Sequence, residues 1–289
     1  MNYEERSQPF EGASGVMHPL LAESVTQFQA QAYKEILPSN GPVRTQVVGA
    51  KNPNTEAQAS RVSEFMNYQL MNVMEEYDTE TDQMLFYLPL SGSAFRKVYY
   101  DQNLGRAVSR FIPAEDLVVP YATTYIYSAG RITHIVEMSM NDIKKLQQAG
   151  FYRDVDISNS MMVDTDYDEV QSEIDELQGI EPSYGENDQC QLYEIHTDLD
   201  ISGYEDMDAQ GEPTGIKLPY VITLSTTNSE ILSIRRNYRQ NDPLKKRINY
   251  FVHYKFLPGL GFYGFGLTHM IGGLSKASTS ILRQLIDAG

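Results

Sequence analysis

The sequence predicts an α+β fold, with helices near both ends of the chain and antiparallel strands between them. Two patterns support this class. Segments with apolar residues three and four positions apart lie near each end, and short β-rich stretches separated by turn residues lie between them. With 289 residues and 41% hydrophobic content, the chain is long and apolar enough to form a core. The final helical stripe contains Leu267, Met270, Ile271, Leu274, Ala277, Ile281, Leu285 and Ala288.

Two amphipathic helices are predicted in the first hundred residues. The first runs roughly from Leu20 to Leu37 and stops before Pro38. A short predicted strand, VRTQVVG, comes next, and the second helix then begins at Asn54 or Thr55, either of which is a suitable N-cap. Its apolar face consists of Ala59, Val62, Phe65, Met66, Leu70, Val73 and Met74.

The predicted strands follow a third helical segment, TETDQMLFYLPL. This segment passes through Ser91–Ser93 into the strand FRKVYYD, which pairs with AVSRFIP across a turn. DLVVPY and RITHIVEMSM are the next two strands, and a short helix capped by Asn141 and closed by Gly150 follows them. A helix is predicted over 168–178. The four remaining strand candidates are CQLYEIHTDLDI, IKLPYVITLST, EILSIRRNY and RINYFVHYKF.

The sequence divides into three predicted parts. Residues 1–18 form a flexible N-terminal lead. Residues 19–257 form one α+β domain, which contains an acidic insertion at about 151–216. Residues 258–289 form a glycine-rich junction that opens into the last helix.

Composition limits the classes of protein to consider. The single cysteine, Cys190, forms no intramolecular disulfide, and no cysteine or histidine has zinc-site spacing around it, so a reducing cytoplasm is expected. Neither a signal peptide nor a run of about 18 apolar residues is present, so no membrane is expected as a partner. The net charge of -16 weighs against tight DNA binding, which depends on clustered Lys and Arg.

The charge is unevenly distributed along the chain. Residues 154–216 contain no Lys or Arg and many carboxylates. Two interpretations stay open: the acidic tract and the basic segment after it are matching contacts between neighbouring subunits, or each is a solvated face. The basic segment, a candidate subunit interface, contains Arg235, Arg236, Arg239, Lys245, Lys246 and Arg247.

The run GLGFYG matches the G-x-G-x-x-G pattern of dinucleotide-binding turns through Gly259, Gly261 and Gly264. No second strand follows its helix to complete a βαβ unit, and Phe262 and Tyr263 add bulk where phosphates would approach. The preferred interpretation is a pliable, tightly turning junction that Phe262, Tyr263 and Phe265 anchor by packing, which makes these glycines and Gly266 hinge candidates. No cofactor is therefore expected.

The remaining motifs for chemistry are weak. Asp164, Asp166 and Asp168 have the spacing of the first calcium ligands of an EF-hand, but Glu169 stands where that loop needs glycine, so a solvated acidic loop is the simpler interpretation. The five histidines are scattered, and the sequence has no P-loop, H-E-x-x-H or G-x-S-x-G motif. The sequence therefore favours a protein that is not an enzyme.

Several long stretches of the sequence carry a further signal: HPLLAESVTQFQAQAYKEILPSNGPVRTQVVG, SGSAFRKVYYD, SRFIPAEDLVVPY, RITHIVEMSMNDIKKLQQAGFYRDV and YKFLPGLGFYGFGLTHMIGGLSKASTSILRQLIDAG. Together they resemble the portal proteins of tailed bacteriophages, most closely those of short-tailed phages. The resemblance spans nearly the whole chain from about His18 onward.

This resemblance implies a structural subunit of a homo-oligomeric ring, usually of twelve copies, at one vertex of the virion capsid. Such a ring is the head-to-tail connector through which double-stranded DNA is packaged and ejected without sequence-specific binding. The implied partners are the terminase large subunit, head–tail adaptor proteins, and capsid and scaffolding proteins, with assembly in the host cytoplasm. Most of the chain would be the α+β wing, and its last helix would begin the stem.

Portal proteins are typically much longer than this chain, so the resemblance implies an N-terminal fragment or a partial chain. Two alternatives belong to other classes of protein. One is a nucleotide-binding enzyme that uses the GLGFYG turn, and the other is a cytoplasmic interaction module unrelated to virions.

Overall fold

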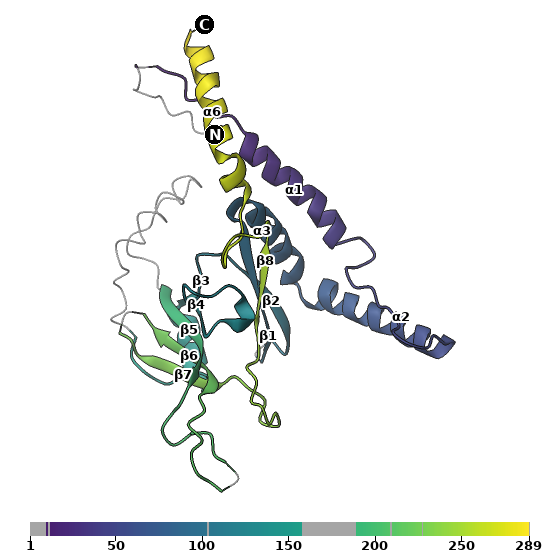
Figure 1. Ribbon diagram of the computed structural model, residues 1–289, viewed down its shortest axis with the longest axis vertical. Coiled ribbons are helices and arrows are strands. Elements are labelled where there is room, and N and C mark those ends of the chain that lie inside the picture. Colours follow the sequence, from purple (N-terminus) through teal and green to yellow (C-terminus); the bar gives the residue numbers. More distant parts are fainter. Residues whose placement is uncertain are drawn as a thin grey trace. The chain divides into compact units, whose positions relative to one another are not determined.

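The computed structural model describes residues 10, 12–102, 104–157, 189–208, 210–226 and 228–288. Within these residues the fold is mixed α+β, with five α-helices, two antiparallel sheets and a long C-terminal helix, which confirms the predicted class (Figure 1). The chain forms two compact units, Met1–Ala114 with Tyr250–Gly289 (unit 1) and Glu115–Asn249 (unit 2). The boundaries between the units fall inside the range 19–257.

Unit 1 combines four α-helices with a three-stranded sheet of order β2-β1-β8. Phe95 of β1 stands opposite Ile112 of β2 on one side and His253 of β8 on the other. Helix α1 packs against α3 and α6 (Figure 1). The elements are α1 Leu20–Ile36, α2 Pro53–Tyr68, the π-helical turn η1 Gln69–Val73, α3 Glu76–Ser91, β1 Ser93–Asp101, β2 Arg106–Ile112, β8 Phe251–Lys255 and α6 Leu267–Ala288.

The core of unit 1 forms around α3. Met84, Leu85 and Leu88 have the three- and four-residue spacing of one helix face, and they pack together with Ala94 of β1. The rings of Phe28 and Phe256 close this cluster edge to face, with centroids 5.1 Å apart. Because α3 ends at Gly92 in the left-handed region, with φ of 88°, the chain turns directly into β1.

Two local predictions in unit 1 are wrong. The N-cap of α2 is Asn52, not Asn54 or Thr55, because Pro53 occupies the first helical position and the Asn52 side chain accepts from the Thr55 backbone N–H. The segment VRTQVVG forms no strand. Its Val43 is held by α2 instead: Asn67 accepts from its N–H at 2.8 Å, and Ser63 donates to its carbonyl at 2.9 Å.

Unit 2 is a five-stranded antiparallel sheet of order β3-β4-β5-β6-β7, with α4 packed beside it. Its core cluster contains Ile143 of α4, Leu192 of β5 and Leu232 of β7. Ser139, not the predicted Asn141, caps α4 by accepting from the Asp142 N–H. The elements are β3 Leu117–Val118, the 3-10 turn η2 Ile126–Ser128, β4 Arg131–Ser139, α4 Met140–Gln148, β5 Gln189–Leu199, β6 Leu218–Ser225 and β7 Ile231–Arg236.

Within the described residues, the other predicted helices and strands are confirmed at their approximate bounds, including the hairpin of β1 and β2, with Asp101 opposite Arg106. Gly150 follows α4 with a positive φ of 69°, as expected for a helix stop. The helix predicted over 168–178 lies outside the described residues.

Candidate functional site

Arg235, the first residue of the basic segment, stabilises the fold of unit 2. Arg235, in β7, donates from Nη2 to the carbonyl of Phe151 at 2.9 Å, and its guanidinium stacks over the Phe151 ring. Burial lowers the pKa of Arg235 from its ordinary value, against the opposing influence of nearby Tyr152 and Glu194. This arginine therefore anchors the loop after α4 to the sheet.

The end of the basic segment pairs with the acidic tract of the same chain. Lys245 forms an ion pair with Asp206. Arg247 pairs with Asp198 at 2.9 Å, and its Nη1 also donates to the carbonyl of Ala129 at 2.6 Å. Lys245 and Arg247, which the sequence analysis treats as candidates for contacts between subunits, are therefore neutralised within one chain.

Three cations of the basic segment stay at the surface: Arg236, Arg239 and Lys246 are exposed. Lys246 and the exposed Lys217 line an open pocket of about 500 Å³ together with Arg247. We call the four exposed cations Lys217, Arg236, Arg239 and Lys246 the basic patch, and two of them, Lys217 and Lys246, line this pocket. Of the predicted interface residues, the patch retains three.

The aspartates proposed as weak calcium ligands, Asp164, Asp166 and Asp168, lie outside the described residues. Among the residues that are described, no group of three His, Cys, Asp or Glu side chains is arranged to hold a metal ion. His196 is buried in β5, where its Nε2 lies 2.7 Å from Glu194 Oε1. His196 is therefore packed within the sheet of unit 2.

The glycines of the GLGFYG region mostly allow backbone to approach backbone. A Cβ on Gly264 would stand 2.5 Å from the carbonyl oxygen of Gly92, and one on Gly266 would stand 2.5 Å from that of Leu90. A Cβ on Gly259 would meet the Tyr263 carbonyl oxygen at 2.1 Å. Only Gly261 of the four hinge candidates has open space beside it. Bending at this junction stays a prediction.

The same turn is closed by hydrogen bonds. Leu257 and Phe265 exchange backbone hydrogen bonds of 3.3 and 2.9 Å, and the Gly264 N–H donates to Ser93 Oγ at 2.8 Å. We call this closed turn, residues 257–266, the glycine clasp. It holds the start of α6 against the junction between α3 and β1.

One aromatic side chain fills the glycine clasp. Phe262 is buried, and its ring lies 4.6 Å from that of His253 and 5.8 Å from that of Phe95. Burial, together with the charge of Lys255, lowers the pKa of His253 to about 4. Tyr263 and Phe265, which were also expected to anchor the joint by packing, are both more than 40% exposed.

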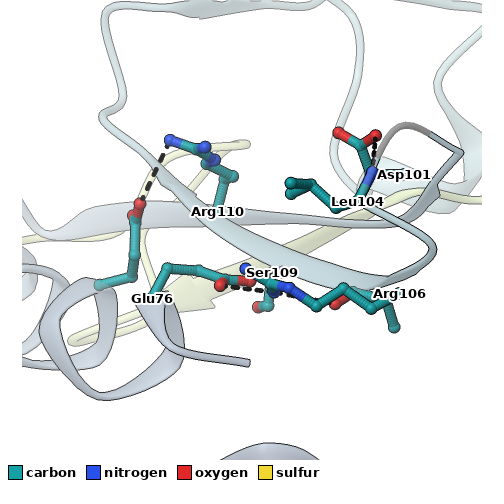
Figure 2. A network of polar contacts seen from close by, with 8 residues as sticks. Glu76, Asp101, Leu104, Arg106, Ser109 and Arg110 are labelled. Atoms are coloured by element: carbon teal, nitrogen blue, oxygen red, sulfur yellow. Dashed lines mark hydrogen bonds and ion pairs between the residues drawn. The ribbon is translucent and has the colours of Figure 1, made fainter. Parts of the chain in front are cut away.

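Carboxylates of α3 protect the outer edge of the unit 1 sheet (Figure 2). Glu76 accepts from Arg106 at 2.7 Å and from the Ser109 backbone N–H at 3.3 Å. One helical turn later, Glu80 accepts from the Phe111 N–H at 2.7 Å. Because β2 is an edge strand, these contacts occupy N–H groups that another strand would otherwise bind.

Helices α2 and α6 of unit 1 carry several large, exposed apolar side chains. No residue of either helix is buried. The sequence predicted the apolar stripe of α6, but periodicity alone does not tell whether core or solvent faces a stripe. No described helix is long and apolar enough to cross a membrane.

No protein-family model matches the sequence, and no curated protein matches it significantly.

Proposed function

We propose that this protein is a structural subunit of a bacteriophage portal ring, forming the conduit for genome packaging and ejection and a docking platform for other virion proteins. The long sequence stretches that resemble short-tailed phage portals support this proposal. The mixed α+β fold with a long final helix is the architecture that this resemblance implies for the wing and the start of the stem.

The observation that carries the proposal is the exposure of α2 and α6. Met270, Leu274, Ile281 and Leu285 of α6 are each more than half exposed, and so is Phe65 of α2. Large apolar surfaces of this kind mark contacts with other molecules. When neighbouring subunits of an assembly contact α2 and α6, the apolar faces of both helices are buried, whereas in a freely diffusing monomer these faces stay in water.

The charge of the chain fits a conduit. With a net charge of -16, the surface repels phosphates on the whole, so duplex DNA passes without being held. The basic patch of Lys217, Arg236, Arg239 and Lys246 is then a local surface for an acidic protein partner, and terminase, head–tail adaptors or a neighbouring subunit are the proposed candidates.

The nucleotide-binding alternative gains no support from the glycine clasp. Its Gly264 and Gly266 bring protein backbone close to protein backbone, where a dinucleotide site would bring backbone close to a pyrophosphate. The alternative of an unrelated interaction module shares the exposed helices but not the resemblance.

Electron microscopy and native mass spectrometry of the longer gene product that the resemblance implies test the proposal. We expect closed rings, with twelve subunits as the principal species. Particles that stay monomeric at all concentrations, or that lack rotational symmetry, would contradict it. A calorimetric titration with NAD and ATP checks the enzyme alternative, for which we expect no detectable heat of binding.

A further inference from the structure

The open pocket of unit 2 presents two cations whose charge is not neutralised. The cations that line it are Lys217, Lys245, Lys246 and Arg247. Lys245 and Arg247 pair with Asp206 and Asp198 of the same chain. Lys217 and Lys246 are exposed, and neither forms an ion pair within the described residues. In a chain with a net charge of -16, this pocket is therefore a local site for an anionic group.

The backbone that carries Lys246 is held in place by Asp242. The Asp242 side chain accepts from the Leu244 N–H at 3.0 Å and from the Lys246 N–H at 3.1 Å. Its carbonyl accepts from the Lys245 N–H at 3.0 Å. Lys245 has a φ of 44°, in the left-handed region that residues with a side chain rarely adopt. These hydrogen bonds keep the turn in this conformation, so Lys246 extends into the pocket lining from a fixed base.

A hairpin with exposed carboxylates lies between β5 and β6. Figure 1 shows the chain between these two strands extending away from the sheet of unit 2. The Asp208 N–H donates to the Glu212 carbonyl at 2.9 Å, which closes the hairpin. Asp208 and Glu212 are both exposed, and neither forms an ion pair in the part of the chain that the structure describes. We call residues 206–208 and 210–214 the acidic hairpin.

Asp206 fixes the base of the acidic hairpin. It forms the ion pair with Lys245, and its Oδ2 accepts from the Thr214 hydroxyl at 2.7 Å. The Thr214 N–H also donates to the Asp206 carbonyl at 2.8 Å. The base of the hairpin is therefore bound to its own copy, while Glu212 stays available to another molecule.

The pocket and the acidic hairpin also match in their apolar groups. Met207 of the hairpin is 50% exposed, and Tyr127, which lines the pocket, is 44% exposed. Met207 lies opposite Pro213, the residue after Glu212. A methionine sulfur makes favourable contacts with aromatic rings. The pocket, with a volume of about 500 Å³, has room for the side chains of both Met207 and Glu212.

We propose that the acidic hairpin of one copy of this chain docks in the pocket of a neighbouring copy, where Glu212 accepts from Lys217 and Lys246. The contact pairs unneutralised carboxylate with unneutralised ammonium groups, so it selects a second copy over a polyanion such as DNA, which the rest of the acidic surface repels. The inference rests on the proposed function, because the neighbouring copy is the adjacent subunit of the ring. Repeated contacts of this heterologous kind close into a ring when the rotation between copies allows it.

Carbodiimide crosslinking of the longer gene product tests the contact. This reagent joins a carboxylate to a lysine amine only where the two groups meet. Isotopically labelled and unlabelled proteins are mixed before assembly, crosslinked, digested and analysed by mass spectrometry. We expect crosslinks from Glu212 to Lys217 or Lys246 in which one peptide is labelled and the other is not. The ion pair of Lys145 and Asp142 is the internal control, because its two residues lie in one chain and their peptides share one label.

A charge exchange gives an independent measurement. Glu212→Lys or Lys246→Glu alone is expected to weaken association between copies about fivefold, and the two together are expected to recover most of the loss. Glu230→Lys is the matched control, since Glu230 is exposed in the turn between β6 and β7 and does not line the pocket. Sedimentation velocity measures association, and circular dichroism checks that each variant is folded.

The outcomes separate this inference from the proposed function. Rings without a crosslink from Glu212 to either lysine would overturn the inference and leave the portal proposal standing. Crosslinks of Glu212 confined to peptides of one label would place the hairpin in the pocket of its own copy, and an equal loss of association in Glu230→Lys would reduce the effect to net charge. Both results overturn the docking. Mixed-label crosslinks in particles without rotational symmetry would support the docking and contradict the portal, and absence of any assembly would contradict both.

Discussion

The carbonyl oxygen of Gly92 lies 2.5 Å from the point where a Cβ on Gly264 would stand. Gly92 ends α3, and Gly264 lies just before α6, so two helices separated by most of the sequence depend on this backbone contact. The Gly264 N–H also donates to Ser93 Oγ, which joins the contact to the start of β1. The glycine clasp is therefore a structural element of unit 1.

Gly264→Ala is expected to destabilise the protein by about 2 kcal/mol, because the added methyl group meets backbone that has no room to move. Gly261→Ala is the matched control, since open space surrounds Gly261, and its effect is expected to stay within about 0.5 kcal/mol. Urea denaturation followed by circular dichroism measures both. Equal stability of the two variants would show that the backbone of the glycine clasp shifts to accommodate the added methyl group.

The ion pair of Glu76 and Arg106 predicts an acid-sensitive unit 1. Burial alone raises the pKa of Glu76, but hydrogen bonds from backbone N–H groups and from Arg106 outweigh it and hold the pKa below its usual value. A carboxyl with a lowered folded-state pKa stabilises the fold above its unfolded-state pKa, and this stabilisation disappears as the pH falls through the folded-state value.

Glu76→Gln is therefore expected to reduce stability at pH 7 by about 1–2 kcal/mol and to flatten the loss of stability below pH 4.5. Asp142→Asn on α4 is a useful comparison, because its ion pair with Lys145 is exposed and its effect at pH 7 is expected to be smaller. Thermal denaturation at a series of pH values measures both variants. A Glu76→Gln profile parallel to that of the unmodified protein would contradict the assignment.

The pKa of Asp116 is shifted in the opposite direction to that of Glu76. Burial, together with the charges of Glu115 and Glu137, raises the pKa of Asp116 from 3.8 to about 6. The folded protein binds this proton more readily than the unfolded chain, so the contribution of Asp116 to stability falls as the pH rises from about 4 to about 6. Above that pH window, the charged Asp116 carboxylate destabilises unit 2.

Asp116→Asn is expected to stabilise the protein at pH 7.5 by about 1 kcal/mol, after allowance for solvent screening of a partly exposed group. At pH 3.5 the two proteins are expected to be equally stable. Chemical denaturation at both pH values tests this, and a stabilisation of the same size at low pH would point to a cause other than charge.

The strands and most helices of this fold are visible in the sequence because periodicity and turn residues are local signals. The β1–β2 hairpin is an example, since its alternation and its turn lie within one short stretch. The predicted strand at VRTQVVG does not form, and it shows the limit of prediction from local signals. Nothing local reveals that Asn67, 24 positions away from Val43, supplies the hydrogen bond that a neighbouring strand would otherwise give.

The candidate interface is less predictable than the fold, because pairing depends on distant residues. From the sequence alone, the six cations from Arg235 to Arg247 are equivalent candidates, but their roles differ once Phe151, Asp198 and Asp206 are in place. The apolar stripe of α6 was predictable as a pattern. Its exposure follows from the contacts of Thr279 and Arg283 with the N-terminal segment, which no periodicity encodes.

The divided roles of the basic segment give a prediction that separates folding from docking. Arg235→Glu is expected to destabilise unit 2 by about 2–3 kcal/mol, because it removes the guanidinium from Phe151 and places a carboxylate near Glu194. The triple variant Arg236→Glu, Arg239→Glu, Lys246→Glu is expected to keep the stability of the unmodified protein within about 1 kcal/mol, because all three side chains are exposed.

If the basic patch binds an acidic partner, the triple variant loses that partner while its monomer stays folded. Sedimentation velocity with and without the terminase large subunit or adaptor proteins measures this loss, and its salt dependence provides a check, since contacts between exposed charges weaken as ionic strength rises. Because Arg235 lies outside the exposed set, its substitution is not a test of docking. Undiminished assembly and partner binding by the triple variant would show that the patch is a solvated face.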